Sequence, residues 1–159
     1  MADEQETVLE ALRALTGVRV DSVRTRPAAR PIFTGLALDP HGSDTVVEVT
    51  LRSGDQLVVG DASGPSTEQA LARTAAVATL EALALLLPDD VRPLLDWVRI
   101  VEAPLPDEPD VVHSVLTLPL QNPQQLVGAA LVRGPVQDAA VRATLAALNR
   151  RISTQSLRG

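Results

Sequence analysis

The chain has 159 residues, of which 45% are hydrophobic, a length and composition typical of one globular domain. It contains no Cys, which excludes disulfides, thiolate metal sites and thiol nucleophiles. Its formal net charge of −6 disfavours nonspecific binding to nucleic-acid phosphates.

The first predicted element is a short helix over residues 4–15. Val8, Leu12 and Leu15 fall on one face of that helix. The N-terminus is acidic and lacks the basic, apolar pattern of a secretory signal. No apolar run is long enough to cross a membrane. These observations favour a cytoplasmic location.

Three strands are predicted next. Alternation of apolar and polar residues indicates strands at 18–24, 45–52 and 56–62. Residues 27–43 contain several Pro and Gly, which predicts a long loop and leaves open a strand extension through 32–33. A turn at residues 53–55 joins the last two strands as a hairpin.

A long helix is predicted from a capping box, formed by Ser66 and Gln69, to about residue 87. It is rich in Ala, a strong helix former. One apolar stripe is expected to face a sheet or another helix. The residues of the stripe are Ala72, Ala76, Leu80, Leu83 and Leu87.

The same order of elements then recurs. Strands are predicted at 97–103, 111–120 and 125–132, with an acidic, Pro-rich loop at 104–110. A second main helix opens at Gly134-Pro135.

Four pairs of short segments support an internal repeat. The pairs are 18–20 with 98–100, 57–60 with 125–128, 63–65 with 133–135, and 78–83 with 143–148. The sequence therefore predicts one α+β domain over residues 1–159. It has two tandem βββα units, 17–88 and 96–152, with two main helices plus the short N-terminal helix. The units are expected to form either one six-stranded antiparallel sheet or two packed three-stranded sheets.

Each unit places a Gly-Pro turn at the start of its main helix. Free backbone N–H groups at a helix N-terminus suit a carboxylate or a phosphate. The candidate ligand-binding residues are Ser63, Gly64, Ser66, Thr67, Arg133 and Gly134. The alternative is a purely structural role, in which Gly turns the chain, Pro occupies the first helical turn and Ser caps the helix.

No set of residues predicts catalysis, a metal site or a cofactor. His41 and His113 are far apart in sequence and lack metal-ligand spacing. There is no phosphate loop, dinucleotide fingerprint or nucleophile elbow. His41 is predicted in a loop, His113 on a surface or interface, and the lone Trp97 as a core or interface anchor.

Residues 60–80, with a Gly-rich turn before an Ala-rich helix, resemble the end of a double-stranded RNA-binding domain. That family grips phosphates with lysines at this helix start, whereas residues 66–69 here are Ser-Thr-Glu-Gln. The resemblance implies a similar fold without that phosphate grip. A nucleic-acid role would instead depend on one basic cluster. Its members are Arg19, Arg24, Arg26 and Arg30.

Residues 134–139 read Gly-Pro-Val-Gln-Asp-Ala, and residues 147–150 read Ala-Leu-Asn-Arg. Both resemble motifs of the C-terminal regulatory domain of alpha-isopropylmalate synthases, which also consists of two strand-strand-strand-helix units. The likeness covers about residues 18–151, although the family has its Gly-Pro motif in the first unit. It implies a dimerising, effector-binding fold without the family's catalytic barrel.

We therefore expect a non-catalytic regulatory or protein-interaction module. It would work as a homodimer or dock to a larger protein, with a small anion at the Gly-Pro turns as a further option. The alternatives are a nucleic-acid-binding module, which the acidic charge disfavours, and an enzyme without a recognisable motif.

Overall fold

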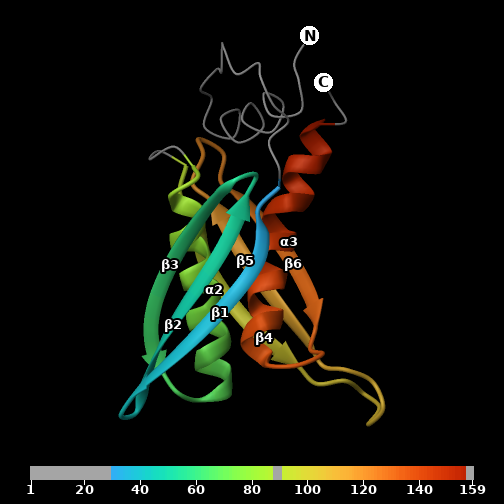
Figure 1. The fold of residues 1–159 in the computed structure, drawn as a ribbon. Coiled ribbons are helices and arrows are strands. Elements are labelled where there is room, and N and C mark those ends of the chain that lie inside the picture. Colours follow the sequence, from blue (N-terminus) through green and yellow to red (C-terminus); the bar gives the residue numbers. More distant parts are fainter. Residues whose placement is uncertain (1–29, 88–90, 157–159) are drawn as a thin grey trace.

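The computed structural model describes residues 30–87 and 91–156. The predicted helix at 4–15 and the predicted strand at 18–24 lie outside this part of the chain. Three strands and a helix occur twice in succession, which confirms the α+β fold of tandem βββα units (Figure 1). The elements are β1 (Ile32–His41), β2 (Asp44–Ser53), β3 (Gln56–Pro65) and α2 (Glu68–Ala84), then β4 (Leu94–Val101), β5 (Val111–Leu118), β6 (Gln124–Leu131) and α3 (Val136–Ser156).

Each unit forms its own antiparallel sheet, with strand order β1-β2-β3 in sheet A and β4-β5-β6 in sheet B. Both turns of sheet A are tight and begin with a glycine. Gly42 has a φ of 64° and Gly54 a φ of 63°. This left-handed conformation is open to glycine at little steric cost, which is why Gly occupies the first central position of each hairpin turn.

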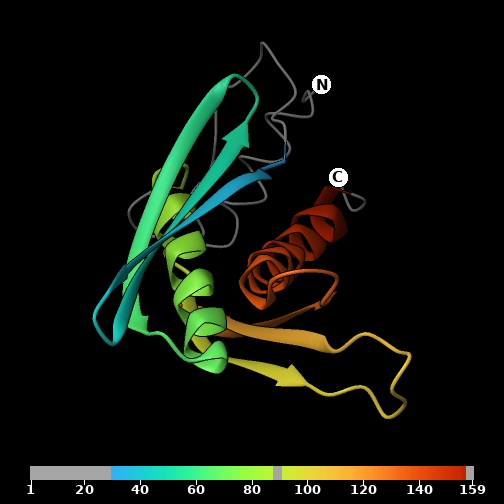
Figure 2. The ribbon, with the colours of Figure 1, turned by 60° about the horizontal axis from the view of Figure 1, so that its bottom comes forward.

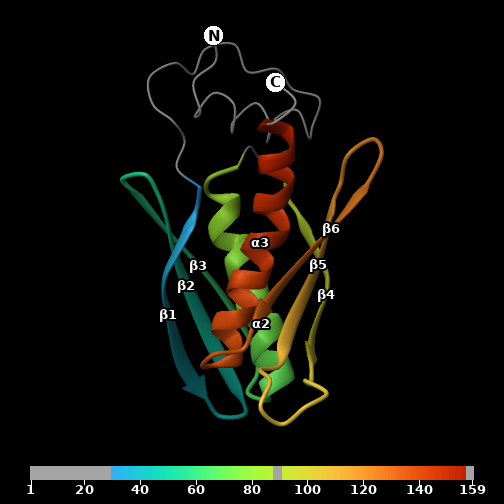
Figure 3. The same ribbon diagram turned by 90° about the vertical axis from the view of Figure 1, so that its right-hand side faces the viewer.

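The two helices lie side by side between the two sheets (Figure 3). Helix α2 packs on β2 and β3 of its own unit and also on β4, while α3 packs on β5 and β6. The helices run in the same direction, so both N-termini lie at one end of the molecule (Figure 1). The sheets are separate, as in the second predicted arrangement, but the prediction that they pack on each other is wrong, because the helices fill the space between them.

The core is aliphatic and continuous across both units. Val47, Val49 and Leu51 of β2 are fully buried, as are Leu116 and Leu118 of β5. The predicted apolar stripe of α2 is confirmed, because its first four residues are buried. Because many of the buried helix residues are Ala, the helices approach each other and the sheets closely.

The two units share one close contact between a strand glycine and the main helix. A Cβ on Gly60 of β3 would collide with the backbone of Ala78 and Ala82 of α2. A Cβ on Gly128 of β6 would collide likewise with Ala143 and Ala147 of α3. These contacts confirm the pairing of 57–60 with 125–128 and of 78–83 with 143–148.

The prediction of a loop over residues 27–43 is wrong for most of that segment, because strand β1 lies within it and extends well past the 32–33 extension left open. The place of β1 in sheet A is that of β4 in sheet B. The pairing shifts at Phe33/Gly35 in β1 and at Leu95/Trp97 in β4. The counterpart of residues 98–100 is therefore 36–38 rather than 18–20. Pro and Gly obscured this strand, but an edge strand tolerates both.

Candidate functional site

The first predicted Gly-Pro turn is part of a strand. Ser63 and Gly64 belong to β3 and pair with Val46 and Thr45 of β2. A Cβ on Gly64 would overlap the side chain of Thr74 in α2. Close packing of strand and helix therefore accounts for this glycine without a ligand.

The hydroxyls at the start of α2 have partners within the fold. Thr67 is the N-cap, and its Oγ1 accepts the Ala70 N–H at 3.3 Å, so the capping box predicted from Ser66 was off by one residue. Ser66 Oγ lies 2.7 Å from Thr45 Oγ1. The Gln69 side-chain amide donates to the Val98 carbonyl of β4 at 2.7 Å, which ties α2 to sheet B.

Arg133 and Gly134 lie exposed between β6 and α3, at the same end of the molecule as the start of α2 (Figure 1). Each helix has an acid in its first turn, Glu68 in α2 and Asp138 in α3. These carboxylates already complement the positive end of each helix dipole. An external anion would therefore be stabilised less at these two helix N-termini than the sequence predicts.

The outward face of sheet B carries most of the exposed apolar side chains of unit 2. Pairing places Trp97, Val115 and Val127 in one row across the three strands. Val127 is 49% exposed, whereas Val115, flanked by the other two, is only 4% exposed. Leu94 is also exposed beside this row. We call Trp97, Val115 and Val127 the central row.

Polar groups border the central row on both sides. The Arg99 guanidinium lies 4.7 Å from the centre of the Trp97 ring, within range of a cation–π interaction. On the other side, Asp96 accepts hydrogen bonds from Thr117 at 2.6 Å and from Gln125 at 3.2 Å. Apolar side chains rimmed by hydrogen-bonding groups are typical of a protein–protein contact.

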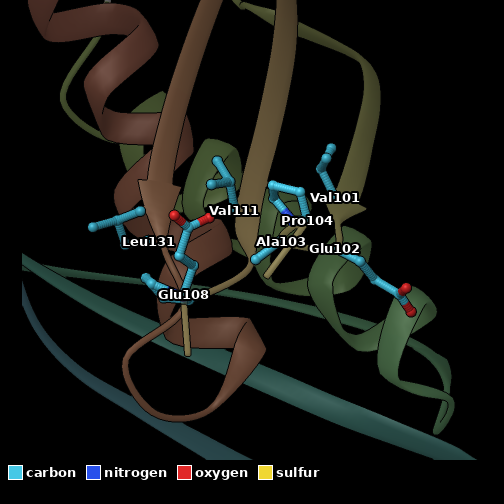
Figure 4. Close-up of a pocket in the computed structure, with 8 residues that line it drawn as sticks. Val101, Glu102, Ala103, Pro104, Glu108, Val111 and Leu131 are labelled. Carbon is cyan, nitrogen blue, oxygen red and sulfur yellow. The ribbon is translucent and has the colours of Figure 1, made fainter. Parts of the chain in front are cut away.

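A cavity of about 340 Å³ lies at the far end of this face (Figure 4). Its floor is the last row of the sheet, Val101, Val111 and Leu131. The connection between β4 and β5, residues 102–110, forms its wall. Asp110 holds this loop in place, because its carboxylate accepts the Ala103 N–H at 2.9 Å and its carbonyl accepts the Val132 N–H at 2.8 Å. None of the six predicted ligand-binding residues lines the cavity.

The two histidines lie in different surroundings. His41 is exposed in the β1–β2 hairpin, where its Nε2 lies 2.9 Å from Asp39 Oδ2. His113 is half-buried on the outward face of sheet B, opposite Arg99 and Ala129. Across residues 30–87 and 91–156, no group of three or more His, Asp or Glu side chains is placed to hold a metal ion.

The sequence does not predict the central row as a unit, because its three residues come from three different strands. The sequence predicts Trp97 alone as a core or interface anchor and does not connect it with Val115 or Val127. One signal was available: β5 is apolar at Val111 and Val115 as well as at Val112, Leu116 and Leu118, which face the core. A strand that is apolar on both faces indicates that both faces are covered.

Comparison with protein-family models and with curated proteins gives no match to this sequence. In the described residues, no helix has both the length and the apolar character needed to span a bilayer. The functional argument therefore depends on the surfaces described above.

Proposed function

We propose that this chain is a non-catalytic protein-interaction module that forms a homodimer through the outward face of sheet B. The observation that carries the proposal is the central row. At the equivalent places on sheet A stand Gly35, Thr50 and Val59, which offer far less apolar surface.

The physical argument is the cost of leaving this face in water. Burial of apolar surface stabilises a complex by roughly 25 cal/mol per Å² before the entropy lost on association is subtracted. Two twisted sheets pack well face to face, about 10 Å apart. Trp97 is the kind of large aromatic residue that dominates binding energy at interfaces.

The size of the face predicts a reversible dimer. Even the whole face, including the end row under the cavity, covers only roughly 14 Å by 26 Å, and the central row takes up part of it. This is smaller than the ~800 Å² per partner of a standard stable interface. We therefore expect a dissociation constant on the order of micromolar. The resemblance of residues 134–139 and 147–150 to a dimerising regulatory domain agrees with this proposal.

The test is sedimentation velocity of the full chain from about 1 to 500 µM, a range that brackets a micromolar constant. The wild type is compared with Val127→Asp and with the matched control Val59→Asp. Val59 and Val127 precede equivalent glycines and are 45% and 49% exposed. We expect Val127→Asp to be monomeric and Val59→Asp to dimerise as the wild type does.

Two results would overturn the proposal. One is a wild type that stays monomeric at the highest concentration. The other is equal weakening of the dimer by both substitutions, because the two sheet faces would then contribute alike. Circular dichroism of each variant checks that its fold is unchanged.

A further inference from the structure

The cavity exists because the two units differ at one connection. In sheet A, β1 and β2 are joined by a tight turn at Gly42 and Ser43, with His41 paired to Asp44. In sheet B, residues 102–110 make the equivalent connection, from Val101 to Val111. Figure 2 shows this longer loop reaching out beyond the sheet. The last row of sheet B therefore gains a wall that sheet A lacks.

The chemistry of the cavity combines an apolar floor with acidic surroundings. Val101 and Leu131 are partly exposed at its floor, with Val111 between them. The loop has four acids and no basic residue. These acids are Glu102, Asp107, Glu108 and Asp110. Of these, Asp110 is used within the loop, as described above.

Glu108 is the acid best placed to contact a ligand in the cavity. Figure 4 shows its carboxylate turned toward Val111 over the cavity, whereas the side chain of Glu102 points away. Among the described residues, the Glu108 carboxylate has neither an ion-pair nor a hydrogen-bond partner. A cation bound above the apolar floor would supply one.

We propose that this cavity binds a lysine side chain, flanked by apolar residues, from another polypeptide. The four methylene groups of lysine would lie along the apolar floor while its ammonium reaches Glu108. A volume of about 340 Å³ is at the lower end for ligand pockets and suits one or two side chains. The inference goes beyond dimerisation and does not depend on it.

Two features favour this occupant over the alternatives. A guanidinium has five N–H donors in a rigid fork, and a single carboxylate over an apolar floor leaves most of them without acceptors. A second copy of this chain contains no lysine, because all of its 14 basic residues are arginine. The partner at this cavity is therefore a different protein.

The test uses three blocked tripeptides, acetyl-Val-X-Leu-amide, in which X is lysine, norleucine or glutamate. Norleucine keeps the apolar stem and removes the charge, and glutamate reverses the charge. Binding to the full-length, isotope-labelled protein is followed by the NMR shifts of the Val101, Val111 and Leu131 amides. For a probe of this size we expect the lysine peptide to bind with a dissociation constant on the order of millimolar.

Glu108→Gln and the matched control Glu102→Gln then test whether the Glu108 carboxylate is the group that binds the lysine ammonium. An exposed ion pair is weak, so we expect Glu108→Gln to reduce lysine-peptide binding about threefold, to the norleucine level. Glu102→Gln should change binding less than about 1.5-fold, since its side chain points away. Equal binding of the lysine and norleucine peptides, or shifts at other amides only, would overturn the proposal.

The same titration is repeated on Val127→Asp. Binding to this variant with unchanged affinity shows that the cavity acts without the dimer. If the wild type proves monomeric yet binds the lysine peptide, only the dimer proposal fails. If dimerisation holds and the three peptides bind alike, only the cavity proposal fails.

Discussion

The outward faces of the two sheets differ far more than the inward faces. Inward, Leu51 of sheet A and Leu116 of sheet B are both fully buried, opposite Phe33 and Leu95. Outward, the Glu48–Asp61 pair is acidic, whereas the equivalent place in sheet B pairs His113 with Ala129. The contrast is largest between the last row of sheet B and the equivalent row of sheet A. In sheet A the row is Asp39, Val46 and Ser63; in sheet B it is Val101, Val111 and Leu131.

This comparison separates what the fold requires from what it leaves free. Packing against a helix requires an apolar inward face and a glycine at one strand position, and both units have them, with Gly60 in unit 1 and Gly128 in unit 2. Nothing in the packing of sheet against helix dictates an outward side chain. Sheet A also exposes Ile32, Leu57 and Val59 outward, but complete apolar rows across all three strands occur in sheet B, which supports the proposed partner on that side.

The largest expected effect comes from the two glycines on which the equivalence of the units depends. Gly60→Ala and Gly128→Ala each place a Cβ against helix backbone, which cannot move aside as a flexible side chain would. We expect each to lower the free energy of unfolding by about 3 kcal/mol or more. Urea unfolding followed by circular dichroism measures this.

Gly35→Ala is the control for both glycine variants. A Cβ on Gly35 would meet no atom within 4 Å, and its backbone is not left-handed. We expect a change in the free energy of unfolding of less than about 0.5 kcal/mol. If only one of Gly60→Ala and Gly128→Ala were destabilising, the two helix–sheet contacts would not be equivalent.

The next prediction concerns the lone tryptophan in the central row. If sheet B faces a second copy, dilution exposes Trp97 to water and shifts its fluorescence to longer wavelength. Half of the shift should occur at the dissociation constant given by sedimentation. In Val127→Asp the emission should be independent of concentration. An emission maximum that never changes in the wild type would place Trp97 outside any dimer interface.

Periodicity in the sequence predicted the strands and helices that lie nearest the core. The alternation of Val47, Val49 and Leu51 and the stripe of α2 were visible because burial selects apolar residues at fixed spacing. Strand β1 was not predicted because it is an edge strand that contains Gly35 and Pro40, and these residue types are also typical of loops.

The candidate site was harder to predict than the fold. The Gly-Pro turns stood out as local motifs, yet Gly64 is explained by its contact with Thr74. The central row joins residues from three strands, and only the register of those strands brings them together. The position of Glu108 over the cavity depends on how its loop folds, which no spacing in the sequence encodes.

A smaller effect tests the observed start of α2. Thr67→Ala removes the side-chain acceptor of the Ala70 N–H and should lower the free energy of unfolding by about 1 kcal/mol. Ser63→Ala is the control, because Ser63 is exposed on β3, and it should change stability by less than about 0.5 kcal/mol. Thermal unfolding measures both. Equal effects would contradict Thr67 as the cap.

The smallest effect is expected where the two cores differ by one hydroxyl. Ser114 of β5 is fully buried, and its Oγ lies 3.0 Å from Thr144 Oγ1 of α3. Because Thr144 donates to the Ala140 carbonyl at 2.8 Å, Ser114 is the donor to Thr144. In unit 1 the equivalent residues are Val49 and Thr79, and Thr79 donates to the Ala75 carbonyl at 2.7 Å.

Unit 1 therefore shows that the helix threonine needs no hydroxyl from the strand. Ser114→Val replaces the hydroxyl and its hydrogen bond to Thr144 by two buried methyl groups, and the free energy of unfolding should change by less than about 1 kcal/mol. The reverse change, Val49→Ser, removes apolar volume from a filled site and should cost about 1–2 kcal/mol. Urea unfolding of both variants compares them directly. A larger loss from Ser114→Val than from Val49→Ser would mean that the two helix–sheet contacts are not interchangeable, even though their glycines are equivalent.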